Sequence, residues 1–278
     1  MAGTLYIVAT PIGNLDDLSA RVKSTFENAD LVLCEDTRRT LKLLNHLGLR
    51  KPLESFHEHN SNEKIPEIIS SLELGKNIAL ATDAGTPGLS DPGADLVRAC
   101  HQLGVKVVPV PGPSAITAAL SVSGFPADRF LFLGFLPAKS AERKKLLETY
   151  RSFPESMILF EAPHRVRQTL QDLIELLGDR PACLCRELTK VFEEVRFSTL
   201  QQIEQDLEKS EPKGEISLVI RGAESSLEKW SASQLDKAIL GQLRSGKSVK
   251  DLAHELAQLS GYSKKEIYQK ALALKDGG

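Results

Sequence analysis

Residues 83–93 read Asp-Ala-Gly-Thr-Pro-Gly-Leu-Ser-Asp-Pro-Gly and directly follow the apolar run Asn77–Thr82. Short apolar runs that end in glycine and proline are typical of buried strands followed by rigid loops. Two further loops of this kind, Thr10–Asn14 and Pro109–Ala115, also follow apolar runs. One such loop is consistent with a tight turn, whereas three at equivalent strand ends favour a ligand site. In open α/β sheets, ligands bind at the carboxyl ends of the strands, where all three loops fall.

Apolar runs and amphipathic segments alternate along the first half of the chain, which predicts an α/β fold. We expect strands at Leu5–Thr10, Leu31–Cys34, Asn77–Thr82 and Lys106–Val110, with helices near Leu18–Asn28, Thr37–Leu47, Glu63–Leu74 and Ala94–Leu103. These strands are apolar along nearly their whole length, as expected where helices cover both faces of a sheet.

A second sheet is predicted after residue 119. Its expected strands are Phe130–Phe135, Met157–Glu161, Ala182–Arg186, Glu194–Phe197 and Glu215–Arg221, with helices near Glu142–Tyr150, Val166–Leu177 and Leu200–Lys209. The strands at 182–186 and 194–197 are close enough in sequence to be antiparallel neighbours. We therefore expect an N-terminal α/β domain at 1–118, a C-terminal α/β domain at 119–223 and a helical appendage at 224–278.

The composition is that of a soluble globular protein, with 41% hydrophobic and 26% charged residues among 278. No run approaches the roughly 18–20 apolar residues that a membrane span needs. The N-terminus runs into a strand without a basic segment, so we expect no signal peptide and a cytoplasmic protein. The four cysteines lack the spacing of a zinc site and are predicted to be reduced core thiols: Cys34, Cys100, Cys183 and Cys185. No metal site is predicted.

Charge is distributed unevenly, although the net charge is only −2. Residues 231–278 carry eight Lys/Arg and five Asp/Glu, a local charge of +3 that leaves −5 for the rest of the chain. Helical patterns at about 233–244, 248–258 and 264–274 in this basic segment resemble a small helix-turn-helix. We expect the segment either to grip an anionic partner or to stabilise the protein or its dimer.

The common nucleotide-binding motifs do not occur in the context that they need. G-x-G-x-x-G is absent, and G-x-x-x-x-G-K-[ST] occurs at Gly241–Ser248, between two expected helices rather than after a strand, which disfavours a nucleoside triphosphate and NAD. Asp83 instead places an acid beside glycine-rich backbone, an arrangement suited to a cationic or amino-bearing ligand. Ser114 suits the start of a helix whose free N–H groups face the ligand.

The loops at Asp83–Gly93 and Pro111–Ala115 resemble the hallmark loops of the tetrapyrrole-methylase superfamily, and the first loop matches its N-terminal motif. Longer stretches resemble one subfamily, the ribosomal RNA small-subunit cytidine-2′-O-methyltransferases: TLYIVATPIGNLDD (4–17), CEDTRRT (34–40), SFHEHN (55–60), FEAPHRV (160–166) and CRELTKVFEE (185–194). The resemblance covers residues 4–222, and the helical tail is also typical of the subfamily.

This resemblance implies a two-domain enzyme, usually a homodimer, that binds S-adenosyl-L-methionine between its sheets. It implies methyl transfer to a cytidine ribose of 16S ribosomal RNA in the small ribosomal subunit. The family's cofactor contacts carry over to Ile12, Asp83, Thr86, Ser114, Ala115 and Phe160, while Gly85 and Pro87 shape the second loop.

Ribose hydroxyls are poor nucleophiles until the proton leaves, so a general base or a polarising cation is expected. Within the subfamily stretches, Asp36, Glu35 and Lys190 are the predicted catalytic residues, without assignment of the base. Asp36 has an alternative interpretation as the cap of the following helix.

Basic residues in the same stretches are predicted to contact RNA phosphate or ribose: Arg38, Arg39, His57, His59, His164, Arg165 and Arg186. Two alternatives remain open. Arg38 and Arg39 form a solvated helix face, and His164 caps a helix that starts near Arg165.

Three rival functions follow from the same sequence. A methylase of a porphyrinoid or corrin precursor shares the fold and cofactor, but does not need CEDTRRT, FEAPHRV, CRELTK or a basic tail. A non-catalytic ribosome-assembly factor would keep the cofactor pocket and lack turnover. An NAD-type oxidoreductase is disfavoured by the missing fingerprint.

Overall fold

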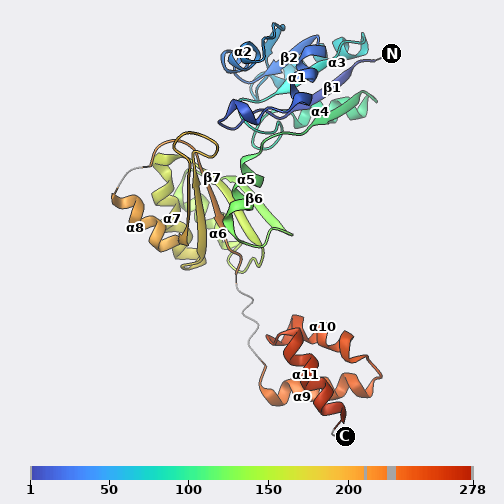
Figure 1. Cartoon of the computed structure of the whole chain (residues 1–278), viewed down its shortest axis with the longest axis vertical. Helices are drawn as coiled ribbons and strands as arrows, with labels where there is room; N and C mark the ends of the chain where they lie inside the picture. The colour runs from blue at the N-terminus through green and yellow to red at the C-terminus, as the bar shows by residue number, and fades with distance from the viewer. Residues whose placement is uncertain (1, 210–211, 224–229, 277–278) are drawn as a thin grey trace. The chain divides into compact units, whose positions relative to one another are not determined.

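The computed structural model describes residues 2–209, 212–223 and 230–276. The chain divides into two compact units (Figure 1). The first unit comprises residues 1–150 and 155–221 and has α/β architecture, while the second comprises 151–154 and 222–278 and is helical. The functional argument rests on the first unit.

A five-stranded sheet forms the N-terminal part of the first unit, in the order β3-β2-β4-β1-β5 with every pair parallel. Its strands are β1 (Thr4–Val8), β2 (Leu31–Cys34), β3 (Leu53–Ser55), β4 (Ile78–Ala81) and β5 (Lys106–Val110). The connecting helices are α1 (Ala20–Asn28), α2 (Thr37–His46), α3 (Ser61–Glu73) and α4 (Ala94–Gln102), and a 3₁₀ turn, η1 (Leu15–Asp17), precedes α1.

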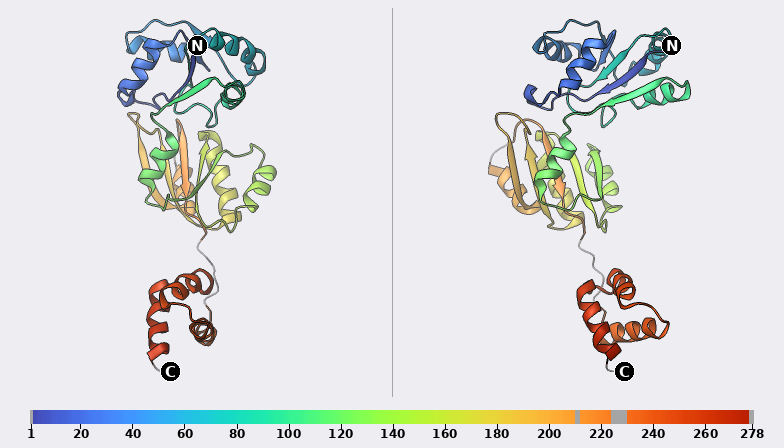
Figure 2. Two further views of the ribbon diagram at one scale, coloured as in Figure 1. Left: turned by 90° about the vertical axis from the view of Figure 1, so that its right-hand side faces the viewer. Right: turned by 45° about the vertical axis from the view of Figure 1, so that its right-hand side comes forward.

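Helices cover both faces of this sheet, as its apolar strands predicted (Figure 2). Phe26 of α1 and Leu44 of α2 pack with Val32 on one face. Leu72 of α3 and Leu96 of α4 form part of the core on the other face. Because both faces are buried, only the strand ends and their loops are left to build a site.

The second sheet has the order β6-β7-β10-β8-β9. Its strands are β6 (Phe130–Phe135), β7 (Ser156–Glu161), β8 (Pro181–Arg186), β9 (Glu194–Thr199) and β10 (Ile216–Ile220). β6 and β7 are parallel, and every other pair is antiparallel, including the predicted pair β8–β9.

One helix, α5 (Ala115–Ser123), packs on one face of this second sheet through Ile116, Ala119 and Leu120. The helices α6 (Ser140–Glu148), α7 (Pro163–Leu177) and α8 (Leu200–Lys209) lie on the other face (Figures 1 and 2). The expectation that a helix starts near Arg165 with His164 as its cap was wrong. α7 begins at Pro163 after Ala162, because proline has no N–H to lose in a first turn.

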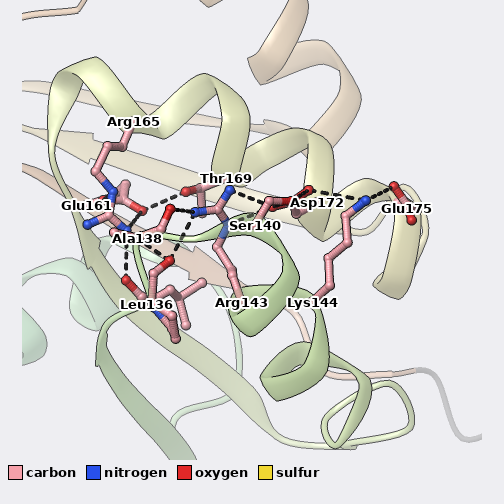
Figure 3. Close-up of polar contacts among 11 residues, drawn as sticks. Leu136, Ala138, Ser140, Arg143, Lys144, Glu161, Arg165, Thr169, Asp172 and Glu175 are labelled. Carbon is pink, nitrogen blue, oxygen red and sulfur yellow. Dashed lines mark hydrogen bonds and ion pairs between the residues drawn. The ribbon is translucent and has the colours of Figure 1, made fainter.

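A buried ion pair joins α6 to α7 (Figure 3). The Arg143 side chain is 0% exposed, and its Nε donates to Asp172 Oδ2 at 2.7 Å. Asp172 also accepts from Ser140 Oγ at 3.0 Å, and Arg143 Nη1 donates to the carbonyls of Pro137 and Ala138. The pair is therefore satisfied on both sides, as a buried charge requires.

All four cysteines are buried and free, which confirms the predicted core thiols. The Sγ atoms of Cys183 and Cys185 lie 3.9 Å apart on one side of β8. Burial raises the pKa of the Cys100 thiol to about 11, so this group stays protonated.

The second unit contains α9 (Ala232–Arg244), α10 (Val249–Ser260) and α11 (Lys264–Asp276). Leu235, Leu252 and Ile267 belong to its separate core. Ser231 and Gln234 form a capping box that begins α9. Across the described residues, no helix is long and apolar enough to span a bilayer.

Candidate active site

Three strand-end loops meet at one edge of the first sheet because β4, β1 and β5 are neighbours. Thr10 and Gly85 exchange backbone hydrogen bonds of 2.8 and 3.0 Å, which ties the first loop to the second. Gly112 ties the third loop to the first: a Cβ there would lie 2.9 Å from the Cβ of Ala9. The three loops therefore form one rigid assembly, and only glycine at position 112 leaves room for the third loop to approach the first so closely.

A cavity of about 450 Å³ lies against these loops, within the range typical of small-molecule sites. Residues of both sheets line it: Ile12, Glu35, Arg39, Asp83–Thr86, Leu89–Asp91, Ser114–Ile116, Phe135, Phe160–Pro163 and Gly214–Ser217. The lining includes all the residues predicted to contact cofactor except Pro87, which is buried in the loop.

Aromatic and aliphatic side chains form the apolar part of the cavity. The Phe160 ring lies 5.8 Å from that of Phe135 and 5.0 Å from that of Phe132, edge to face in both pairs. Ile12 and Ile116 complete this wall. Such a surface is suited to a planar, weakly polar ring.

Carboxylates form the polar part. Glu35 follows β2, while Asp83 and Asp91 lie in the loop after β4, and all three line the cavity. Asp83 Oδ1 accepts from the Asp36 backbone N–H at 3.0 Å, and its Oδ2 lies 3.4 Å from Arg39 Nε. Burial, together with the charges of Glu35 and Asp83, raises the pKa of Asp91 to about 6. This concentration of negative charge favours a ligand that carries positive charge.

The first turn of α5 borders the cavity at Ser114 and Ala115. Ser114 is the N-cap, but its side chain makes no capping hydrogen bond. The backbone N–H groups of the first turn are therefore available to a ligand acceptor such as a carboxylate.

Glu161 lines the cavity, and neighbouring side chains hold its carboxylate in place (Figure 3). Its side chain is fully buried, and Oε2 accepts from Thr169 Oγ1 at 2.6 Å. Arg165 Nε lies 3.3 Å from Glu161 Oε1, and Arg165 Nη2 donates to the Leu136 carbonyl at 2.7 Å. These contacts give Arg165 a structural role behind the cavity, while its predicted RNA contact stays a prediction.

Asp36 caps α2, which is its alternative interpretation. Its Oδ1 accepts from the Arg38 backbone N–H at 2.9 Å, and Oδ2 pairs with Arg38 Nη2 at 2.7 Å. Hydrogen bonds from the Arg38 side chain and backbone lower the pKa of Asp36 to about 2. Asp36 does not line the cavity, so its catalytic role stays a prediction that this geometry does not favour.

Lys190 is engaged by carboxylates. Its Nζ lies 2.8 Å from Glu187 Oε1 and 3.1 Å from Glu215 Oε2, and Glu215 lines the cavity. Burial lowers the pKa of Lys190, but the hydrogen bonds to the two carboxylates outweigh it and raise the pKa overall. A Cβ on Gly13 would lie 2.5 Å from Lys190 Cγ, so this loop packs directly on the first strand-end loop. Lys190 is therefore a charged neighbour of the cavity, and its catalytic role stays a prediction.

The other predicted RNA contacts lie in separate places. Arg39 lines the cavity, whereas the Arg38 side chain is 86% exposed. The rings of His57 and His59, after β3, are 6.0 Å apart. His164 is exposed on the first turn of α7, and Arg186 pairs with Glu194 at 3.0 Å.

Asp91, Glu161 and Glu215 are the charged cavity residues that the sequence interpretation did not assign. Asp91 lies inside the quoted loop 83–93, Glu161 inside FEAPHRV and Glu215 in an expected strand, so the sequence marks their positions but not their roles. Their roles depend on contacts from other elements, which no local pattern contains. Among the described residues, no three His, Cys, Asp or Glu side chains are grouped to hold a metal ion.

Residues 4–204 match the family described as Tetrapyrrole (Corrin/Porphyrin) Methylases. The chain belongs to this family. It is 43% identical to a ribosomal RNA small subunit methyltransferase I of Mesorhizobium japonicum, covering 98% of this chain and 92% of the relative. A protein of the same name from Pseudomonas aeruginosa is 42% identical over 98% of this chain and 97% of its own length.

A third relative of that name is shorter. The Thermotoga maritima protein is 45% identical, and its whole length matches 80% of this chain. The match leaves about a fifth of this chain without a counterpart there.

Solved structures of other proteins confirm the fold. A diphthine synthase has a TM-score of 0.62 at 17% identity, covering 79% of this chain and 90% of that one. A uroporphyrin-III C-methyltransferase of Thermus thermophilus, solved with S-adenosyl homocysteine, has a TM-score of 0.56 at 16% identity, covering 79% and 97%. The predicted two-sheet tetrapyrrole-methylase fold with C-terminal helices is therefore confirmed.

Proposed function

We propose that this protein transfers a methyl group from S-adenosyl-L-methionine to a cytidine ribose 2′-hydroxyl of small-subunit (16S) ribosomal RNA. The observation that carries the proposal is the match along nearly the whole chain to relatives named ribosomal RNA small subunit methyltransferase I. Identities near 40% over this length are far above those to the porphyrinoid methylases, which are 16–20%.

The cavity has the chemistry that this donor requires. Phe160, Phe135 and Ile12 offer an apolar wall for adenine, while Asp83 offers negative charge to the ammonium group. The first turn of α5 offers N–H groups to the carboxylate of the methionine part. When bound, the donor supplies an electrophilic methyl group, and the chain's part is to orient it, exclude water and remove the acceptor's proton.

Homodimer formation is part of the proposal. Phe197 of β9 lies opposite Cys183, whose side of the sheet packs against α5, and Phe197 is 63% exposed. Val195, two residues before Phe197 and therefore on the same face of β9, is exposed as well. Apolar side chains exposed side by side on one sheet face are typical of a covered interface, and we propose a second copy as the cover. Light scattering of the purified protein tests this directly.

The helical unit is proposed to grip the ribosomal substrate rather than to catalyse. Its exposed Lys237, Lys250 and Lys264 carry positive charge suited to phosphate. The family match ends at residue 204, before this unit, which favours a role outside the chemical step. Truncation after Gly222 is expected to weaken binding to small subunits while methyl transfer persists. Unchanged affinity would leave only the stabilising role.

The deciding experiment is methyl transfer from labelled S-adenosylmethionine to small subunits purified from cells that lack this protein. Nucleoside mass spectrometry of the product is expected to show 2′-O-methylcytidine. Transfer to a tetrapyrrole precursor but to no RNA would keep the fold and cofactor and replace the substrate. Binding to the subunit without turnover would favour a ribosome-assembly factor. We also propose a cytoplasmic location, where this substrate is found.

A further inference from the structure

The cofactor cavity adjoins a second hollow of about 470 Å³. Glu35, Ser90 and Asp91 line both, so these three residues form the wall that the two spaces share. The second hollow is otherwise lined by Phe56, Glu58, Ser61 and Pro92–Asp95. A transfer reaction needs donor and acceptor on either side of such a boundary, with the reacting atoms about 3 Å apart.

Asp91 is the half-buried acid of the shared wall, whereas Glu35 is exposed. Among the described residues, the Asp91 carboxylate, like that of Glu35, makes no hydrogen bond or ion pair, whereas Asp83 has both and Asp36 is held by Arg38. The preceding residue, Ser90, has φ of +64°, a conformation that costs energy outside glycine. The loop therefore holds Asp91 at the shared wall at a conformational cost, without a structural bond that explains it.

Charged groups lie near Asp91 in its own loop and on three other elements. Glu35 lies after β2, Glu58 before α3, Asp83 after β4 and Asp95 in the first turn of α4, where it pairs with Arg98. Arg39 of α2 lines the same cavity and pairs with Asp83 at 3.4 Å. Burial and the charges of Glu35 and Asp83 hold the pKa of Asp91 near 6. A carboxylate with that pKa is ionised at neutral pH and a stronger base than an ordinary one.

We propose that Asp91 is the general base that accepts the proton of the attacking ribose hydroxyl. The inference rests on the proposed function and adds the residue that the sequence left unassigned. Asp36 and Lys190 are less suited, because the first is held by Arg38 and the second is a charged ammonium.

The step balances in atoms and charge. The hydroxyl proton passes to an Asp91 carboxylate oxygen while the hydroxyl oxygen forms its bond to the methyl carbon. The carbon–sulfur bond breaks with its electron pair left on sulfur, so a sulfonium and a carboxylate become a neutral thioether and a carboxylic acid. Asp91 then returns the proton to water.

Single-turnover methylation of small subunits by the full-length protein tests the proposal. Asp91→Asn is expected to slow the chemical step by about 10²- to 10⁴-fold, the usual contribution of a positioned base. Its Kd for S-adenosylmethionine, measured by calorimetry, should stay within about threefold of wild type, since Asn keeps shape and polarity. Asp128→Asn is the matched control, because it removes an exposed aspartate that lines neither space, and should leave the rate nearly unchanged.

Two further readouts separate catalysis from structure. The wild-type rate should fall below about pH 6, and Asp91→Glu should retain measurable activity with a displaced acid limb. A ¹³C-carboxyl titration of the protein without cofactor should place one aspartate near 6 that is absent in Asp91→Asn. An active wild type with Asp91→Asn within threefold of it would overturn this inference alone. A wild type that methylates no RNA would overturn the proposed function as well.

Discussion

Two acidic residues of the first unit, Asp172 and Asp91, have opposite surroundings. Asp172, between α6 and α7, is buried and meets Arg143, Lys144 and Ser140. Asp91, at the cavity, is partly buried and meets no described partner. Satisfied buried charges hold elements together, whereas a desolvated carboxylate without a partner costs stability and gains reactivity. The difference indicates where the fold is built for rigidity and where for chemistry.

The largest expected loss of stability comes from removing Asp172, the acid that is paired. Asp172→Ala leaves the Arg143 guanidinium buried without its anion, which typically costs about 3–5 kcal/mol. Urea unfolding followed by circular dichroism measures the loss. Glu175→Ala is the control, because its ion pair with Lys144 is largely exposed and should contribute less than about 1 kcal/mol. Equal effects would show that burial does not distinguish the two pairs.

Arg165 joins the two regions, since it supports a cavity residue from the protein interior. Arg165→Met is expected to destabilise the protein by about 1–3 kcal/mol, because buried Glu161 keeps only Thr169 and a backbone N–H. It should also weaken S-adenosylmethionine binding in the absence of RNA. His164→Ala, one residue away and exposed, should change neither. If Arg165→Met impairs only RNA binding, the original RNA assignment is favoured.

Asp91 should respond to pH in the opposite sense to a paired carboxylate. Because its pKa is raised to about 6 in the folded state, its favourable contribution exists below its unfolded pKa and is lost as pH rises through 6. Asp91→Asn should therefore match wild type in Tm near pH 4. Above pH 6.5 it should be more stable by roughly 1 kcal/mol, or about 2–4 °C, after allowing for solvent screening.

Thermal unfolding of wild type and Asp91→Asn between pH 4 and 8 tests this dependence directly. Glu35→Gln, at the same wall, is the comparison variant. A Tm difference between Asp91→Asn and wild type that does not change with pH would contradict the assignment of the titration to Asp91.

Asp36 is expected to have the smallest effect on stability, and its contribution depends on pH in the opposite direction to that of Asp91. Arg38 lowers its pKa to about 2, so its contribution exists above its unfolded pKa and is lost as pH falls through about 2. Asp36→Ala should lower Tm at pH 7 by a few degrees through loss of the helix cap, whereas Asp36→Asn keeps a capping oxygen. Full methylation activity in Asp36→Asn would remove Asp36 from the catalytic candidates.

Much of the fold was predictable because its signals are local. The apolar runs of the first sheet and the glycine-rich loop at 83–93 mark strand ends without any knowledge of neighbours. The antiparallel pair β8–β9 followed from its short connection. The three-residue edge strand β3 was not among the expected strands, since so short a strand has little periodicity.

The site was predictable where a strand end fixed it and unpredictable where contacts fixed it. Ile12, Asp83 and Ser114 line the cavity because they follow adjacent parallel strands. Asp36 and Arg165 belong to equally distinctive stretches, yet one caps a helix and the other supports Glu161. Sequence distinguishes neither role, because both depend on which group lies opposite.

The sequence by itself determined the order of strands and helices, the three loops that meet at the cavity and the family of the chain. Only the tertiary structure decided which acids are paired. Hydrogen bonds and burial act over a few ångströms between segments far apart in the chain, as with Arg143 and Asp172 or Glu35 and Asp91. The pKa of a carboxylate is set by those neighbours and by its loss of water, and neither is written in the residues beside it.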